Sequence, residues 1–61
     1  MNYNSWIPCS RRLPPDGLEV DTKIDDEKGC RNVTTLKYHR NLWWFPDMSA
    51  YVYYSPTHWK Y

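Results

Sequence analysis

The sequence predicts an all-β domain, either a small curled antiparallel sheet or an SH3-like barrel of four to five short strands with an aromatic core. Short stretches alternate apolar and polar residues with period two, which is typical of half-buried strands. Tight-turn residues and prolines separate these stretches. No stretch has the periodicity of an amphipathic helix.

The length of 61 residues predicts one domain with one small core. A chain of this size buries only about 60% of the surface that it exposes when unfolded. Four Trp, six Tyr and one Phe compensate for the few aliphatic residues, since each aromatic side chain buries a large area. We expect residues 1–5 to form a flexible N-terminus and residues 6–61 to form the domain.

The charge and the apolar pattern narrow the functional classes. A net charge of +1 gives no electrostatic case for binding DNA or an anionic membrane. No apolar run reaches the roughly 20 residues of a membrane span, and the first residues lack the features of a signal peptide. These observations predict a cytoplasmic protein that does not enter membranes. In that compartment Cys9 and Cys30 are expected to be reduced, with a disulfide between them as the less favoured alternative.

The N-terminal part predicts an edge strand followed by turns. Residues 6–9 are extended, and Pro8 restricts them to an edge strand or a lead-in because it lacks an N–H. Residues 10–13 are expected to form one turn of helix that ends before Pro14. Asp16 and Gly17 then turn the chain.

Residues 18–24 alternate most regularly, which predicts a half-buried strand with one wet side. Its inward face would carry Leu18, Val20, Thr22 and Ile24. Residues 25–29 form a polar turn, and residues 30–38 the next strand. Either of two alternating sets of side chains in this strand could face the core. We favour the set with Leu36 and Tyr38 inward, because the other set would bury Lys37.

Three consecutive aromatic residues follow a tight connection at residues 39–41. Successive strand residues point to opposite faces, so Trp43 and Phe45 share one side and Trp44 takes the other. One side must be core, and the other must be a second packed layer, a partner surface or exposed apolar area. Residues 50–54 are expected to form another strand, with Tyr51 and Tyr53 on one face.

Two end segments carry a resemblance to a known family. They read Trp6-Ile7-Pro8-Cys9-Ser10-Arg11-Arg12-Leu13-Pro14-Pro15 and Thr57-His58-Trp59. This pattern resembles domain of unknown function 551, whose members read W-I-x-V-x-x-R-L-P near the start and T-H-W near the end. Cys9 stands where the family prefers Val. The resemblance implies a phage or prophage origin and the cytoplasm of a bacterial host, and it implies no catalytic residues.

The end motifs also have a structural interpretation, in which they fasten the two ends of the domain. We expect Trp6 to pack against Trp59, as cross-strand aromatic pairs do. Arg12 would stack on one of these rings or pair with Asp16. The residues assigned to this structural motif are Trp6, Arg12, Leu13, Pro14, His58 and Trp59.

The chemical candidates are weak. Cys9, Cys30, His39 and His58 are spread along the chain without the local pairs that make zinc motifs specific. No Gly-rich phosphate loop is present, and His58 is the sole candidate base near a structured end. We therefore expect no enzyme activity, no metal and no cofactor.

The leading hypothesis is a small phage-encoded protein that binds a host protein or defence complex and inhibits it through an exposed aromatic patch. Trp, Tyr and Arg dominate interface hot spots, and the chain has more aromatic residues than its core can hide. The predicted partner-binding residues are Tyr38, Arg40, Trp43, Trp44, Tyr51 and Tyr53. The alternatives are a binder of single-stranded nucleic acid, a structural or accessory phage domain, and a homodimer.

Overall fold

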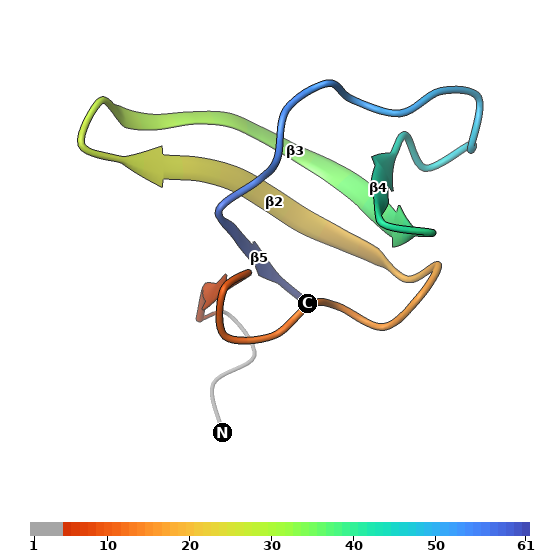
Figure 1. The fold of residues 1–61 in the computed structure, drawn as a ribbon, viewed down its shortest axis with the longest axis horizontal. Coiled ribbons are helices and arrows are strands. Elements are labelled where there is room, and N and C mark those ends of the chain that lie inside the picture. Colours follow the sequence, from red (N-terminus) through yellow and green to blue (C-terminus); the bar gives the residue numbers. More distant parts are fainter. Residues whose placement is uncertain (1–4) are drawn as a thin grey trace.

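The computed structural model describes residues 5–61 as one open antiparallel sheet (Figure 1). Its strands, in the spatial order β1-β5-β2-β3-β4, are β1 (Ile7–Pro8), β5 (His58–Lys60), β2 (Glu19–Asp26), β3 (Gly29–His39) and β4 (Leu42–Trp44). No helix occurs within residues 5–61. The all-β prediction is therefore confirmed, and the sheet is open rather than closed into a barrel. Apart from Ser5, the predicted N-terminal tail lies outside the described residues.

The long hairpin of β2 and β3 forms the middle of the sheet. Its turn is closed by Asp26, whose carboxylate accepts the Lys28 N–H at 2.9 Å and both Arg31 terminal nitrogens at 2.9 and 3.2 Å. Hydrogen bonding by Arg31 is the main cause that lowers the pKa of Asp26. Further along, the register shifts between Thr22 and Ile24, opposite Asn32 with φ 56°. Such a bulge bends the hairpin and increases its twist.

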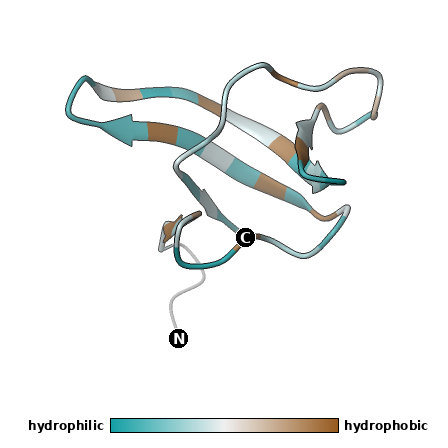
Figure 2. Cartoon of the chain, in the orientation of Figure 1, coloured by the Kyte–Doolittle hydropathy of each residue, from teal (hydrophilic) through white to brown (hydrophobic). Residues whose placement is uncertain are grey.

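The core covers one face of this sheet. Val20, Leu36, Trp43 and Trp59 form the buried cluster, and Leu36 and Trp59 have no exposed surface. Cross-strand pairing places these residues on a common face, because Val20 lies opposite Leu36 and Thr22 opposite Trp59. In Figure 2, brown or pale bands alternate with teal bands along β2, in keeping with a period of two. The predicted inward phase of Leu36 is confirmed.

The loop between β4 and β5 covers this core face. In Figure 1 it leaves β4, passes in front of β3 and β2 and enters β5 beside β2. Val52 packs against the core cluster from this loop, and Cys9 does so from the segment after β1. Without these two segments, one face of a twisted sheet would expose Trp43 and Trp59 to water. The loop is therefore part of the core and not merely a connection.

The predicted last strand at residues 50–54 is wrong. This segment makes a single bridge, between Tyr51 and Trp44, and a hydrogen bond from the Val52 N–H to the Trp43 carbonyl at 2.9 Å. The chain then bends away because it must cross the sheet to reach β5. The period-two burial of the segment still holds, with Tyr51 and Tyr53 exposed and Val52 half-buried.

Three smaller expectations at the N-terminal side also need correction. Residues 10–13 form no helix; instead the backbone N–H groups of Arg11 and Arg12 both bond to the Pro8 carbonyl, which makes a turn starting two residues earlier. Leu18 precedes β2 and is 40% exposed, so it does not join the inward face. The polar turn shortens to two residues because β2 extends to Asp26 and β3 begins at Gly29.

Candidate partner-binding surface

A tight turn after β4 carries two exposed apolar side chains, Phe45 and Met48. The Phe45 N–H bonds to the Ala50 carbonyl at 2.9 Å, and the Met48 N–H bonds to the Phe45 carbonyl at 2.8 Å. Met48 takes a left-handed conformation with φ 62° to close the turn. The Asp47 carboxylate accepts the Ser49 N–H at 3.0 Å. Hydrogen bonding by Ser49 lowers the pKa of Asp47, which keeps the carboxylate charged.

Trp44 supports this turn from the sheet. Its indole N–H donates to the His39 carbonyl at 2.9 Å, which fixes the ring across the β3–β4 connection. The Tyr51 ring meets it edge to face, with centroids 5.3 Å apart and an interplanar angle of 70°. Such aromatic pairs contribute about 0.5–1.5 kcal/mol beyond the area that they bury. Trp44 is therefore half-buried, and its ring supports the turn and the Tyr51 ring from below.

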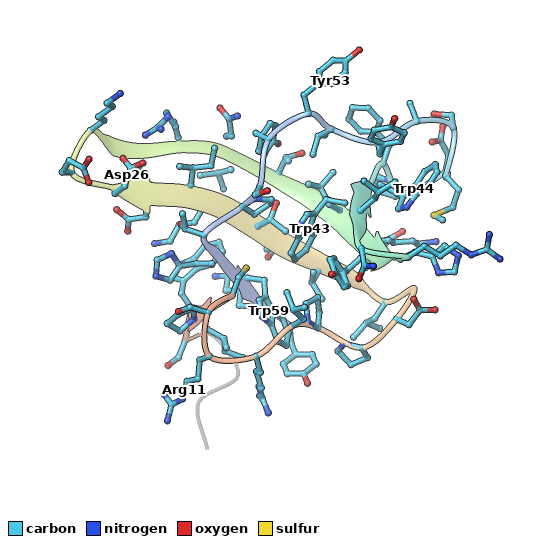
Figure 3. The ribbon with its side chains drawn as sticks, viewed as in Figure 1. Arg11, Asp26, Trp43, Trp44, Tyr53 and Trp59 are labelled. Atoms are coloured by element: carbon cyan, nitrogen blue, oxygen red, sulfur yellow. The ribbon has the colours of Figure 1, made fainter. Side chains whose placement is uncertain are left out.

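Four large side chains on this segment face solvent, and we call them the aromatic surface: Phe45, Met48, Tyr51 and Tyr53. Their exposed fractions are 43%, 37%, 47% and 102%. Tyr53 points away from the sheet in Figure 3, above the loop that crosses the core. Large apolar side chains gathered in this way are the usual sign of an interaction site on a small domain.

The predicted partner-binding residues divide into three groups. Tyr51 and Tyr53 lie on the aromatic surface, and Trp44 supports it. The assignment of Trp43 is wrong, because its side chain is only 6% exposed and belongs to the core. Figure 3 shows Trp43 over the middle of the sheet, away from Tyr53.

Tyr38 lies in β3 and Arg40 in the β3–β4 turn, outside the segment that carries the aromatic surface. Tyr38 is half-buried against Trp43, with ring centroids 4.9 Å apart, and its hydroxyl is 3.4 Å from the Asn41 side-chain oxygen. Arg40 and Asn41 are the two central residues of the β3–β4 turn, with φ 51° and 65°. Two consecutive left-handed residues are the mark of a type I′ hairpin turn.

Sequence reasoning missed Phe45 and Met48 as surface residues. It grouped Phe45 with Trp43 on one side of a strand, but β4 ends at Trp44 and Phe45 has already entered the turn. The signal was present in Pro46, which follows directly and cannot donate to a strand ladder.

The end motifs come together as neighbouring strands. Ile7 pairs with Trp59 and Pro8 with His58, which places Pro8 on the edge strand of the sheet. The Trp59 indole N–H donates to the Arg12 carbonyl at 2.9 Å, and the Arg12 guanidinium lies over the Trp59 ring at 5.7 Å. Pro14 is buried, whereas Leu13 is 47% exposed.

The expected packing of Trp6 on Trp59 is wrong. Trp59 and Lys60 are consecutive in β5 and point to opposite faces of the sheet. Trp6 lies on the side of Lys60, and the ammonium groups of Lys60 and Lys23 sit 4.8 and 4.5 Å from its ring centroid. The Trp59 ring instead meets Tyr61 edge to face, with centroids 5.1 Å apart. Asp16, the alternative partner for Arg12, pairs with His39 at 2.9 Å.

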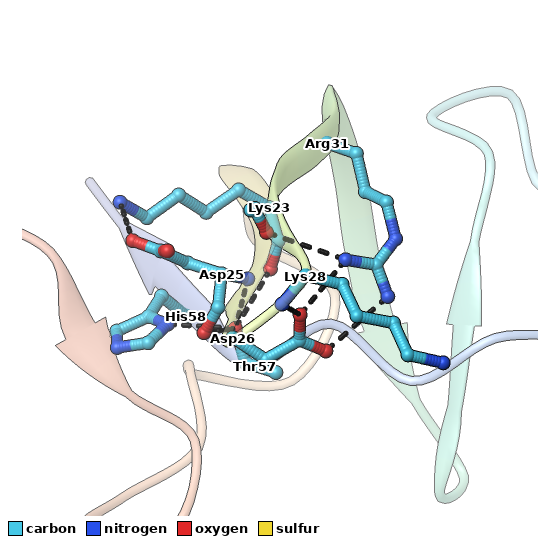
Figure 4. Close-up of polar contacts among 8 residues, drawn as sticks. Lys23, Asp25, Asp26, Lys28, Arg31, Thr57 and His58 are labelled. Carbon is cyan, nitrogen blue, oxygen red and sulfur yellow. Dashed lines mark hydrogen bonds and ion pairs between the residues drawn. The ribbon is translucent and has the colours of Figure 1, made fainter.

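Thr57 and His58 fasten β5 to the central hairpin (Figure 4). The Thr57 N–H donates to the Lys23 carbonyl at 2.9 Å, and its hydroxyl oxygen accepts the Asp25 N–H at 2.8 Å. The His58 Nδ1 lies 2.7 Å from the same hydroxyl. Lys23 in turn bridges to the Asp25 carboxylate at 3.0 Å. Every residue of the T-H-W motif thus has a structural role: Thr57 and His58 form hydrogen bonds at the sheet, and Trp59 belongs to the core.

The remaining chemical groups are sparse. Cys9 and Cys30 are free thiols, and burial raises the pKa of Cys9, which leaves its sulfur protonated and a poor nucleophile. Within residues 5–61, no group of three or more His, Cys, Asp or Glu side chains is placed to hold a metal ion. No helix in this part of the chain is long and apolar enough to cross a membrane.

Comparison with known proteins identifies the family. The family model described as "Protein of unknown function (DUF551)" matches residues 5–61, so the chain belongs to this family. No curated protein and no solved structure matches the chain.

Proposed function

We propose that this member of the family is a non-enzymatic module that binds a protein partner through the aromatic surface. The observation that carries the proposal is the exposure of Tyr53, at 102%, on the same chain segment as the exposed Tyr51 and Phe45. Tyr is among the residue types most enriched at interface hot spots, because it offers a large rigid contact and a polar end.

The rigidity of the turn supports the same proposal. Backbone hydrogen bonds tie both Phe45 and Val52 to residues across the turn, and the Tyr51 ring is held on Trp44. A preformed surface loses less conformational entropy when it binds, so more of its contact energy appears as affinity. This argues for a defined partner rather than for loose association.

The charges nearby favour a protein over a nucleic acid. Asp47 is the sole charged residue within residues 45–54. Single-strand binders surround their stacking rings with Lys and Arg to track the phosphates. Here Asp47 is set against a nearby cation, Lys37, which pairs with Trp44 across the sheet. Binding through the aromatic surface should therefore depend little on salt, whereas phosphate binding weakens steeply as salt rises.

The partner that we propose is a protein of a bacterial host, and the biological effect is to inhibit or modulate it in the host cytoplasm. This step rests on the phage or prophage origin that the resemblance to the family implies. A small domain whose sequence has no recognisable catalytic motif can act on a larger protein by covering part of its surface.

The test is differential capture from bacterial lysate with the intact chain. We expect the wild-type protein to retain one host protein with and without nuclease, and Tyr53→Ala to lose it. The matched control is Val33→Ala, which removes a 63% exposed apolar side chain from the central hairpin. Equal capture by Tyr53→Ala and wild type, with both folded, would refute the proposal. So would a loss of capture on nuclease treatment.

A further inference from the structure

A second surface, distant from the aromatic one, is built by the turn after β1. The Pro8 carbonyl accepts the backbone N–H groups of Arg11 at 2.9 Å and Arg12 at 3.3 Å. The Trp59 indole N–H then holds the Arg12 carbonyl at 2.9 Å. Because Trp59 is fully buried, this bond attaches the turn to the core. In Figure 3, Arg11 and Tyr53 lie at opposite ends of the molecule.

The two arginines of this turn line a pocket. Among the described residues its walls are Ile7, Arg11 and Arg12, and its volume is about 290 Å³. That volume lies just below the range typical of drug-sized ligand pockets and is enough for a small anion. Ile7 supplies an apolar wall, and Arg11 and Arg12 each bring a permanent positive charge to the site.

Neither guanidinium is neutralised by a carboxylate within residues 5–61. The ion pairs of the described chain use other cations, namely Lys23 with Asp25, Arg31 with Asp26 and His39 with Asp16. Arg12 is oriented by its ring contact with Trp59 at 5.7 Å. A guanidinium held near an aromatic ring by cation–π attraction keeps N–H donors that can bind an anion.

We propose that this pocket binds the dianionic phosphate group of a phosphate monoester. Two permanent positive charges match a charge near −2, and a single carboxylate would leave one of them uncompensated. Phosphate also offers three acceptor oxygens, and arginine is the residue best suited to bind them in pairs. The proposal is independent of the aromatic surface, because the two sites share no residue.

The experiment is a titration of the full chain with phenyl phosphate, followed by amide and arginine side-chain NMR signals. We expect saturable shifts concentrated in Ile7, Arg11 and Arg12. Methyl phenyl phosphate, the monoanionic diester, should bind at least about fivefold more weakly, because charge-assisted hydrogen bonds weaken with the charge of the acceptor.

Arg11→Gln should weaken phenyl phosphate binding about tenfold or more, since it removes one charged donor. Arg11 is exposed, so the variant should fold as the wild type does. Lys28→Gln is the control, because it removes one positive charge from the far turn of the central hairpin. Its affinity should stay within about twofold of wild type, as expected for an exposed charge distant from the site.

Two results would overturn the proposal: shifts that lie outside residues 7–12, or equal affinity of wild type and Arg11→Gln. A phosphotyrosine peptide with no other charged side chain separates the sources of the phosphate group. If the peptide binds much more tightly than phenyl phosphate, the site takes phosphorylated chains. If the two bind alike, it takes small phosphate esters.

Discussion

Replacement of Trp59 by Phe tests whether the T-H-W motif closes the core. The substitution removes an indole N–H that donates to the Arg12 carbonyl at 2.9 Å, and it removes part of a ring that has no exposed surface. The lost hydrogen bond costs about 0.5–1.5 kcal/mol. The missing ring atoms leave a void in the core, which should lower the free energy of unfolding by a further amount of about 1–3 kcal/mol, as in other large-to-small substitutions.

Together these effects predict a loss of about 2–4 kcal/mol, to be set against a total stability of roughly 3–9 kcal/mol for a chain of this length. Thermal unfolding followed by far-ultraviolet circular dichroism should show a fall in Tm of about 10 °C or more. Trp44→Phe is the matched control, because it also removes an indole N–H bonded at 2.9 Å, here to the His39 carbonyl, but from a half-buried ring. If Trp59→Phe costs no more than Trp44→Phe, the closing role of Trp59 is refuted.

Three further predictions address other parts of the fold. Trp6→Ala removes the ring that both the Lys23 and the Lys60 ammonium groups contact, and it should lower the free energy of unfolding by about 1–2 kcal/mol. An unchanged Tm would show that these cation–π contacts do not stabilise the fold. The pKa of Asp26 is lowered from 3.8 in the folded state, so its stabilising effect is present at neutral pH and is lost as pH falls below that value. Acid titration of unfolding should therefore be shallower in Asp26→Asn, and identical acid profiles would count against the Arg31 pairing. Arg40→Asn should raise stability by about 0.5–1 kcal/mol in urea unfolding, because Asn tolerates φ 51° better than Arg does. A loss of stability in that variant would show that the Arg40 side chain makes a needed contact.

The sequence was informative wherever alternation was clean. Val20, Thr22 and Ile24 face inward because the residues that alternate with them are charged and need water. Leu36 faces inward because the opposite orientation of its strand would bury Lys37. The turn between β2 and β3 was placed by its polar residues. These features depend on neighbouring residues alone, so local reasoning could find them.

Features that depend on the path of the chain in space were missed. Residues 50–54 alternate as a strand does, yet the chain must cross the sheet to bring Trp59 beside Thr22, and this leaves only the Tyr51 bridge. The same crossing covers Trp43, which removes it from the candidate surface. The side of the sheet on which Trp6 lies follows from the pairing of β1 with β5, and no local pattern encodes that pairing.

The candidate surface was predictable in part. Tyr51 and Tyr53 were placed on one exposed face by period two, and the burial pattern agrees. Phe45 and Met48 join them because Pro46 stops the strand and Met48 adopts φ 62° to close the turn.

The most direct test of the account is a solvent-accessibility footprint of the captured complex. Hydroxyl-radical labelling would compare the free and the bound chain, with Phe45, Met48, Tyr51 and Tyr53 as reporters. The account predicts that labelling of these four side chains falls several-fold on binding, while that of Leu13 and Val33 stays unchanged. Protection at Leu13 or Val33 with the aromatic surface still labelled would contradict it.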